Sequence, residues 1–387
     1  MLEKSEVKRI PGSSKNSIKN TLEYKMTLFF TLFILGVFVL YFLMPDNEKS
    51  EWENRYLEQA PKLSVTDLLD GTYMTKYEDY INDQIPFRDG FIKVKAVAEA
   101  GLLKCENNGI VKGKDSYLFT KGKDDTTVFD KNIDIIDQFA KSVDSRVTVA
   151  IAPNASGVLE DKVPKGFMMP NQAEKLDALY ADKTLLKDAR VVDLKSVLRA
   201  REDEYIYYRT DHHWTTNGAY YAYQEISENP IDLSAISENV KAMEAGDFLG
   251  TLYAKYKGLF VNSDIITYYD IPVLKYSADG KEYAGLLDTD KLSAFDKYGM
   301  FMRGNFGRCD VKTSTKNGKS LIIFKDSYAN CLIPFLTYDY EDIIVLDLRY
   351  AKESIKELVS DHKDSDILFL YNFDFLNEDN HFYKLMK

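Results

Sequence analysis

An aspartate and two histidines stand together in the stretch YRTDHHWTTNGAYYAY, residues 208–223. The chain of 387 residues contains only four histidines, and two of them, His212 and His213, follow Asp211 directly. Alternate residues of an extended segment face the same side, so Asp211 and His213 share one side while His212 and Trp214 share the other. A carboxylate that hydrogen-bonds one imidazole nitrogen can orient the ring and leave its second nitrogen to act as a general base.

A serine far downstream is a candidate partner for that base. In LIIFKDSYAN, residues 321–330, Ser327 follows an apolar strand pattern and opens a helical one. Catalytic groups of open α/β sheets gather at the carboxyl ends of strands, and backbone N–H groups in the first turn of a helix can stabilise an oxyanion. Serine is a weak nucleophile that needs a base and an orienting carboxylate. Ser327, His213 and Asp211 are therefore candidates for nucleophile, base and orienting acid.

Other interpretations of these residues stay open at this point. A serine that follows aspartate at a helix start is also typical of an N-cap, and Asp211 could cap the helix that follows it. An Asp-His-His run also occurs in manganese-dependent phosphoesterases, but such a site needs further Asp and His ligands from other loops. The two remaining histidines, His362 and His381, lie near the C-terminus, and we expect no metal site and no cofactor.

Alternating strand and helix patterns surround both motifs. This alternation favours a mostly parallel sheet with helices on both faces, a three-layer α/β/α domain. Residues 230–300 differ, with many tyrosines and short alternations, and are interpreted as an insertion of strands and loops. Upstream, Pro86 should separate two helices, and 109–119 should form a hairpin. The strand patterns lie in RVTVAIAPN (146–154), ARVVDLKSVLRA (189–200), EYIYYRT (204–210), KSLIIFKDSYANCLIPFLTY (319–338), EDIIVLDLRY (341–350) and DILFLYN (366–372).

The N-terminal region predicts a retained membrane anchor. Residues 26–44 carry no charge and are long enough to cross a bilayer as one helix. Lysines and an arginine precede this run and acidic residues follow it, so the positive-inside rule places residues 1–25 in the cytoplasm. A cleaved signal peptide is the rival, but no small-x-small cleavage site follows the run. We expect a stalk over 45–65 and an extracytoplasmic domain over 66–387.

Composition narrows the classes of partner. The net charge of −11 without a basic stripe argues against nucleic acid. Three cysteines do not make a disulfide framework, and no Cys/His cluster indicates zinc. The 27 tyrosines could stack against sugars, but tyrosine is also an ordinary residue at the edge of a core.

The chain resembles the bacterial DHHW proteins, which are similar to the alginate O-acetyltransferase group of SGNH-hydrolase-like proteins. The resemblance implies an SGNH-like core in a permuted order, with the Asp/His block before the serine. It assigns Asp211 as the orienting acid, His213 as the base and Ser327 as the nucleophile, while His212 occupies a variable position. The matching segments, in the family order, are ENRYLEQAPKLS, YEDYINDQIPFRDGFIKVK, GIVKGKDSYLF, TDHHWTTNGAYYAY, FMRGNFGRCD and KDSYANCLIPFLTYDYEDIIVLDLRY.

Several positions near the serine are candidate substrate contacts or depart from the pattern of related proteins. Asn305 is a candidate oxyanion or substrate contact, with Gly304 permitting close backbone approach, although Asn305 could equally be a turn residue; His212 is a further candidate for such a contact. Lys325 precedes Asp326 where hydrolases of this fold usually have glycine, and Arg303 also stands where relatives have glycine. A lysine beside the nucleophile could tune or obstruct the site.

The resemblance implies a membrane-anchored O-acetyltransferase that acts outside the cell. Its acceptor would be a cell-wall or exported polysaccharide, and a membrane-bound O-acyltransferase would supply the acetyl groups. Two alternatives remain: an extracytoplasmic carbohydrate esterase with the same triad, and a non-catalytic glycan-binding or scaffold subunit of a polysaccharide-modifying complex.

Overall fold

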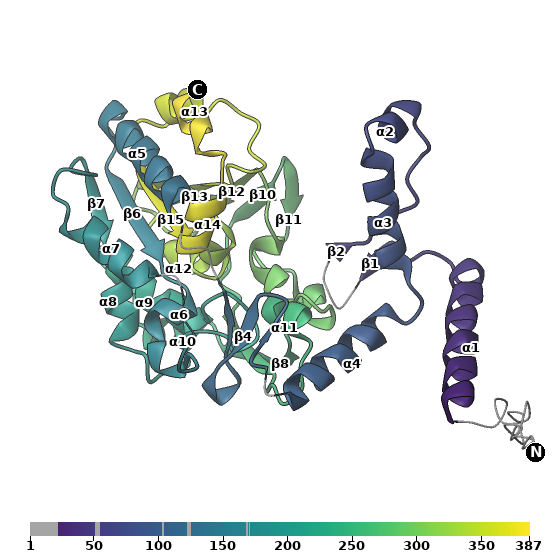
Figure 1. Ribbon diagram of the computed structural model, residues 1–387. Helices are drawn as coiled ribbons and strands as arrows, with labels where there is room; N and C mark the ends of the chain where they lie inside the picture. Colours follow the sequence, from purple (N-terminus) through teal and green to yellow (C-terminus); the bar gives the residue numbers. More distant parts are fainter. Residues whose placement is uncertain (1–21, 51–54, 103, 122–124, 168, 170) are drawn as a thin grey trace, which may run out of the picture. The chain divides into compact units, whose positions relative to one another are not determined.

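The computed structural model describes residues 22–387, apart from 51–54, 103, 122–124, 168 and 170 (Figure 1). The chain divides into two compact units. The first comprises Met1–Ser50 and Arg55–Phe91, and the second comprises Glu51–Asn54 and Ile92–Lys387. The sequence places the start of the extracytoplasmic domain at residue 66, and those domain bounds remain a prediction.

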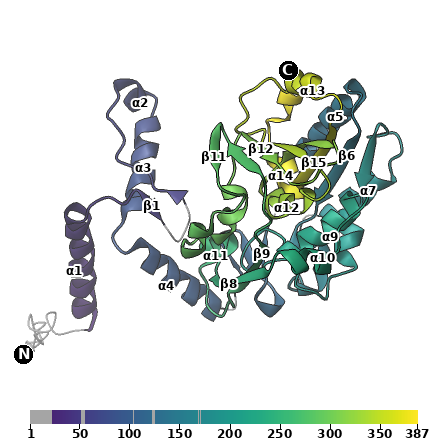
Figure 2. The same cartoon turned by 180° about the vertical axis from the view of Figure 1, so that it is seen from behind.

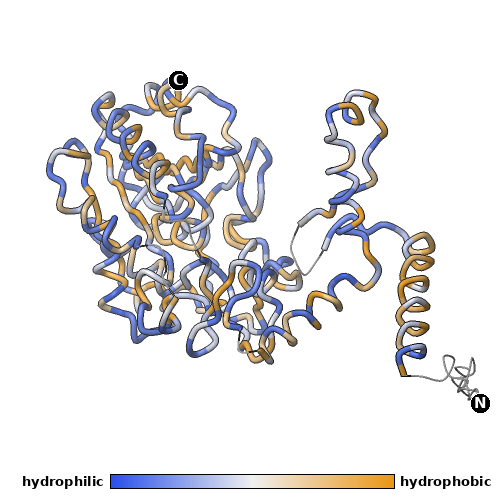
Figure 3. The backbone as a smooth tube through the Cα atoms, in the orientation of Figure 1, coloured by the Kyte–Doolittle hydropathy of each residue, from blue (hydrophilic) through white to orange (hydrophobic). Residues whose placement is uncertain are grey.

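The first unit contains a helix suited to a membrane. α1 (Leu22–Leu43) is long and apolar enough to span a bilayer, and none of its side chains is buried. Hydrophobic residues dominate most of its length (Figure 3). Residues 1–21 of the expected cytoplasmic segment lie outside the described residues.

Residues 45–65, expected to be an irregular stalk, contain two short strands that pair antiparallel, β1 (Lys49–Ser50) and β2 (Arg55–Tyr56). The Gln84 side chain accepts from Asn47 N at 2.9 Å and donates to Glu58 O at 3.0 Å, which fastens this segment to the third helix. The helices that follow are α2 (Val65–Leu69) and α3 (Thr72–Gln84) in the first unit, and α4 (Arg88–Gly101), most of which belongs to the second unit. The break between α3 and α4 contains Pro86, as expected.

An eight-stranded sheet organises the second unit, in the order β11-β10-β12-β14-β13-β15-β6-β7. The five strands from β14 to β7 are parallel, and β12, β10 and β11 continue the sheet antiparallel. A mixed α/β fold with a large sheet is therefore confirmed. The strands are β6 (Val147–Ala152), β7 (Ala189–Val192), β10 (Lys275–Ala278), β11 (Lys281–Tyr283), β12 (Arg308–Lys312), β13 (Ser320–Lys325), β14 (Asp342–Leu346) and β15 (Asp366–Asn372).

Both faces of this sheet are buried. Side chains alternate along β13, so that Leu321 and Ile323 belong to one hydrophobic cluster while Ile322 and Phe324 belong to another. Helices pack on each face (Figures 1 and 2). The first cluster includes residues of α6 (Ala155–Val158), α8 (Leu194–Arg199), α9 (Thr216–Ile226) and α12 (Ile333–Leu336); the second includes α5 (Thr127–Ser142), α7 (Gln172–Ala181), α13 (Ile355–Asp361), α14 (Phe373–Glu378) and the 3-10 turn Phe382–Met386.

The expected strand at 204–210 is wrong. This segment forms a buried loop with a single antiparallel bridge between Tyr207 and Trp214. Tyr208 N donates to His213 O at 3.2 Å, and Thr215 N donates to Ile206 O at 2.9 Å. The aromatic residues that favoured a strand are used for burial, and the backbone folds back on itself at the Asp-His-His run.

Residues 230–300 contain helices as well as strands. β8 (Ala242–Phe248) pairs with β9 (Asp264–Tyr269), while β10 and β11 extend the large sheet. The segment also contains α10 (Leu233–Asn239), α11 (Thr251–Tyr256) and the 3-10 helices η4 (Thr289–Ser293) and η5 (Lys297–Arg303). Upstream, β4 (Ile110–Lys112) and β5 (Leu118–Thr120) form the expected hairpin, with β3 (Glu106–Asn107) beside β4 and the 3-10 turn Lys114–Ser116 between β4 and β5.

Candidate active site

The predicted nucleophile, base and acid form one chain of hydrogen bonds. Ser327 lies at the carboxyl end of β13, as the first residue of the 3-10 helix η6 (Ser327–Cys331). Its Oγ lies 2.8 Å from His213 Nε2, and His213 Nδ1 lies 2.5 Å from Asp211 Oδ1. These distances let the carboxylate hold one ring nitrogen while the other accepts the serine proton.

Asp211 is almost fully buried, but both of its carboxylate oxygens accept hydrogen bonds. Oδ1 also accepts from His213 N, and Oδ2 accepts from the backbone N and Oγ1 of Thr251, at 2.8 and 2.9 Å. Burial opposes ionisation of Asp211, but the neighbouring imidazoles of His212 and His213 and these hydrogen bonds hold its pKa well below the usual value. The structure therefore favours an ionised acid behind the imidazole.

The start of α11 comes very close to Asp211. A Cβ atom at Gly250 would lie 2.3 Å from Asp211 Cβ and 2.5 Å from its Oδ2. Only glycine therefore allows this backbone to approach closely enough for Thr251 to donate to the carboxylate.

A second buried carboxylate fixes the loop before the Asp-His-His run. Asp264 Oδ1 accepts from Arg209 N at 2.9 Å and from the Tyr205 hydroxyl at 2.5 Å, while Oδ2 accepts from Thr210 N at 2.8 Å. These bonds hold the backbone immediately before Asp211. Sequence reasoning missed Asp264, because nothing in its local pattern in the 230–300 segment marks it.

The residues after His213 connect this loop to the turn Ser327–Cys331, called the serine turn below. Trp214 is completely buried, and its Nε1 donates to Tyr328 O at 2.9 Å. Thr215 is the N-cap of α9, where its hydroxyl accepts from Gly218 N. Thr215 rather than Asp211 therefore caps this helix, which leaves the carboxylate for His213.

His212 lies beside the base but is more exposed. Its ring centroid is 3.8 Å from that of His213, and its Nδ1 lies 2.7 Å from Thr251 Oγ1. Although 41% of the His212 side chain is exposed, desolvation of its ring and the neighbouring His213 lower the pKa of His212, which favours a neutral ring. Asp211, His212 and His213 also present ligand atoms within 4.8 Å of one another. A metal ion there would compete with the hydrogen bonds that link Asp211, His213 and Ser327.

The comparisons with known proteins bear on this arrangement. The family model described as DHHW protein matches residues 105–346, which include the Asp-His-His-Trp run and the serine turn. The chain belongs to the DHHW protein family. A comparison with curated protein sequences found no match.

Solved structures resemble this DHHW protein over most of their own length. A DHHW family protein from Eubacterium siraeum has 26% identity and a TM-score of 0.62, covering 73% of this chain and 96% of that one. PatB1 from Bacillus cereus, with a sulfonyl adduct, has 20% identity and a TM-score of 0.58, covering 70% and 96%. The O-acetyltransferase domain of AlgJ from Pseudomonas putida matches with 14% identity and a TM-score of 0.42, covering 70% and 93%.

In the described part of the chain, no contact links the Lys325 ammonium group to the side chain of Ser327. It is buried, and its Nζ donates to the Oδ1 atoms of Asn305 and Asn330, each at 2.8 Å. Asp347 Oδ2 lies 3.9 Å from the same Nζ and accepts from Arg349 Nη2 at 2.6 Å. The departure from glycine thus places an ammonium group in a polar network under the serine turn.

Asn305 and its neighbours have no described contact with the three central residues. Asn305 is exposed, and its hydrogen bonds are with Lys325 and Asn330. Gly304 has φ 111°, a conformation that favours glycine. The Arg303 guanidinium lies over the Tyr283 ring, and its Nε donates to Gly285 O at 2.9 Å.

Asp326 anchors the serine turn to the adjacent strand. Its Oδ1 accepts from Tyr328 N at 2.9 Å and caps η6, and its Oδ2 accepts from Asn372 N at the end of β15 at 2.7 Å. Burial raises the pKa of Asp326 to about 6. Asp326 rather than Ser327 is therefore the cap, which leaves the serine hydroxyl for His213.

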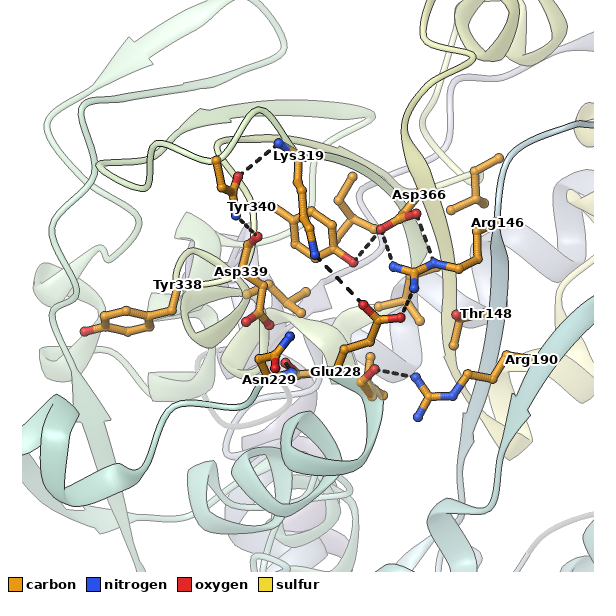
Figure 4. A pocket seen from close by; sticks show the side chains of 17 residues that line it. Arg146, Thr148, Arg190, Glu228, Asn229, Lys319, Tyr338, Asp339, Tyr340 and Asp366 are labelled. Carbon is orange, nitrogen blue, oxygen red and sulfur yellow. Dashed lines mark hydrogen bonds and ion pairs between the residues drawn. The ribbon is translucent and has the colours of Figure 1, made fainter.

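A cavity of about 150 Å³ lies elsewhere, at the amino ends of β6, β13 and β15 (Figure 4). Its two arginines already have partners: Arg146 pairs with Asp366 and Glu228, and Arg190 donates to the backbone O of Ile226 at 2.8 Å. Because Ser327 stands at the carboxyl end of β13, this cavity is separate from the predicted active site.

Proposed function

We propose that this DHHW protein is a membrane-anchored, extracytoplasmic O-acyltransferase with an SGNH-like fold. The observation that carries the proposal is the hydrogen-bond chain from Ser327 Oγ through His213 to a buried, ionised Asp211. The parallel strands with helices on both faces, and the position of Ser327 after a central strand, support an SGNH-like core.

In the proposed reaction, His213 Nε2 takes the proton of Ser327 as Oγ attacks the carbonyl carbon of an acetyl donor. The tetrahedral intermediate collapses, the leaving group takes the proton from His213, and the acetyl group stays on Oγ as an ester. A sugar hydroxyl then gives its proton to His213 and attacks this ester, and Ser327 recovers its proton. Asp211 holds Nδ1 and balances the positive charge of the imidazolium in both halves.

Asn305 is our candidate to stabilise the oxyanion. An ammonium group only donates hydrogen bonds, so the atom of Asn305 that faces Lys325 must be its oxygen. The NH₂ group then points away from Lys325 as a donor on an exposed side chain. Tyr328 N is already used by Asp326, which makes a side-chain donor more valuable here.

The acceptor and the partner rest on the resemblance. We propose a cell-wall or exported polysaccharide as the acceptor and a membrane-bound O-acyltransferase as the source of acetyl groups. The apolar helix α1 would hold the catalytic unit at the membrane where such a partner acts. PatB1, which shares the fold, was solved with a sulfonyl adduct, and sulfonyl reagents are electrophiles that activated nucleophiles attack.

A transfer assay tests this function. Full-length protein in detergent, given an activated acetyl ester and a cell-wall oligosaccharide, should place acetyl groups on the sugar, and Ser327→Ala should abolish this transfer. Ser320→Ala is the matched control, because Ser320 lies on the same strand and pairs with Ser365 away from the site. Acetate release without transfer would indicate the esterase instead. Polymer acetylation that survives Ser327→Ala in cells would indicate the scaffold.

A further inference from the structure

Tyr298, in η5 from the 230–300 segment, contacts both the predicted base and the predicted nucleophile. Its ring lies parallel to that of His213, with centroids 3.6 Å apart and an interplanar angle of 8°. Its hydroxyl donates to the backbone carbonyl of Ser327 at 3.0 Å. In the described part of the chain, no other aromatic ring stacks face to face on His213; those of His212 and Tyr328 are tilted against it by 37° and 48°.

The stacked ring constrains a motion that Asp211 leaves open. The bond to Asp211 fixes one nitrogen of His213, but a single hydrogen bond at the ring edge does not fix the plane of the imidazole. A parallel ring at van der Waals distance does fix that plane, and so keeps Nε2 directed at Ser327 Oγ. Tyr298 is 3% exposed, so its own orientation is set by packing.

The hydroxyl of Tyr298 binds the backbone of the predicted nucleophile. It donates to Ser327 O and lies 3.4 Å from Tyr328 O and 3.3 Å from Cys331 Sγ, all on the serine turn. Burial raises the pKa of Tyr298 well above its usual value, so the hydroxyl stays protonated and remains a donor. One rigid side chain thus spans the base and the backbone of the nucleophile.

We propose that Tyr298 is a positioning residue that sets the plane of His213, fixes the Ser327 turn, and stabilises His213 while it carries the serine proton. The last effect follows from charge: an imidazolium over the negative face of an aromatic ring is attracted to it, whereas a neutral imidazole gains less. This inference rests on the proposed function, because it assigns Tyr298 a part in proton transfer.

Two substitutions separate the ring from the hydroxyl. Tyr298→Leu removes both, and we expect acylation by an activated acetyl ester to slow about tenfold, with the acid limb of its pH profile moved by up to about one unit to lower pH. Tyr298→Phe keeps the ring, so acylation should slow about two- to tenfold through loss of the hydroxyl bond, with the acid limb unmoved. Tyr220→Phe is the control, since it removes a partly buried hydroxyl on α9 that donates to Ile231 O, away from the site.

A spectroscopic readout does not depend on turnover. The chain has four histidines, so selective ¹³C labelling gives few imidazole signals. The His213 ring protons should be shifted upfield by the aromatic ring at position 298, both in the unsubstituted protein and in Tyr298→Phe. A His213 signal without this upfield shift in the unsubstituted protein would overturn the proposal, even if Tyr298→Leu does not fold.

The kinetic outcomes also decide between the two proposals. If the unsubstituted protein forms no acyl-enzyme, the proposed function fails whatever the His213 signal shows. If it does form one, and Tyr298→Leu retains both the rate and the acid limb of the unsubstituted protein, the role of Tyr298 is overturned. If Tyr298→Leu and Tyr298→Phe are both less stable, but the folded protein keeps the normal pH profile of acylation, Tyr298 serves only in packing and the proposal is likewise overturned.

Discussion

At the scale of single residues, the site buries charged side chains, and nearly all of them have hydrogen-bond or ion-pair partners. Asp211, Asp326 and Lys325 are each at most 2% exposed. Asp211 is stabilised as an anion by four donors, whereas Asp326 has two backbone donors that do not offset its burial. Two carboxylates near one serine therefore differ in proton affinity, because their surroundings differ.

Asp326 should make stability depend on pH. Its pKa is about 6 in the folded chain against an ordinary value of 3.8, so the folded state holds this proton more tightly than the unfolded state. The stabilisation is fully present below about pH 4 and is lost as the pH rises through 6, by about 3 kcal/mol. Asp326→Asn cannot titrate, so its unfolding free energy should fall less between pH 4 and pH 7.5. Urea unfolding followed by Trp214 fluorescence measures this; equal pH dependence in both proteins would refute it.

Lys325 should affect both stability and acylation. Lys325→Met removes the donor that orients Asn305, but Asp347 stays paired with Arg349, so we expect a loss of about 1–3 kcal/mol rather than the larger cost of an orphaned charge. Acylation should slow as well. Arg349→Met is the comparison: it should lower the melting temperature while Lys325 still holds Asn305. If Lys325→Met acylates at the normal rate, Asn305 does not act through this lysine.

At the scale of elements, the site depends on where loops and helix starts meet. β13 delivers Ser327, the loop before α9 delivers Asp211 and His213, and α11 supplies donors to the acid. The close approach of α11 is possible only because its preceding residue has no side chain.

Gly250→Ala should therefore damage the site with little effect on the rest of the fold. The new methyl group would overlap Asp211, so the carboxylate or α11 must move, and we expect acylation to fall by about 100-fold, as found for small misplacements of reacting groups. Gly246→Ala, where a Cβ meets nothing within 4 Å, is the matched control. Comparable acylation by the two variants would show that the position of Asp211 does not matter.

The sequence predicted those features whose signal is local. Apolar strands followed by polar residues indicated the parallel core. The expected pairing of Asp211 with His213 is present, but it is made across a bend at residues 209–213 and not along an extended segment. The strand at 204–210 was wrong, because aromatic residues favour both strands and buried loops, and only tertiary contacts to Asp264 decide between them. The position of Tyr298 could not be predicted from its neighbours in the sequence, because its contacts with His213 and Ser327 form only when distant segments fold together.

At the scale of the whole molecule, the unit that contains the predicted active site is joined to a helix able to cross a membrane. Charge bias predicts that this unit lies outside the cell. Of the three cysteines, Cys105 is exposed, whereas Cys309 and Cys331 are buried. This difference provides a reporter of orientation in the natural chain.

A membrane-impermeant maleimide should label Cys105 in intact cells. Labelling should disappear in Cys105→Ser, because burial raises the pKa of the Cys309 thiol to about 11 and that of the Cys331 thiol to about 12 and shields both. Labelling that requires permeabilised cells would place the unit in the cytoplasm and remove its access to an exported glycan.

The most direct measurement is the mass of the intact protein after brief exposure to an activated acetyl ester. The account predicts one added acetyl group, located on Ser327 by peptide mapping, and no addition in Ser327→Ala or His213→Ala while Ser320→Ala is modified normally. Acetylation that persists in Ser327→Ala, or a protein that stays unmodified at every pH where it is folded, would contradict the account.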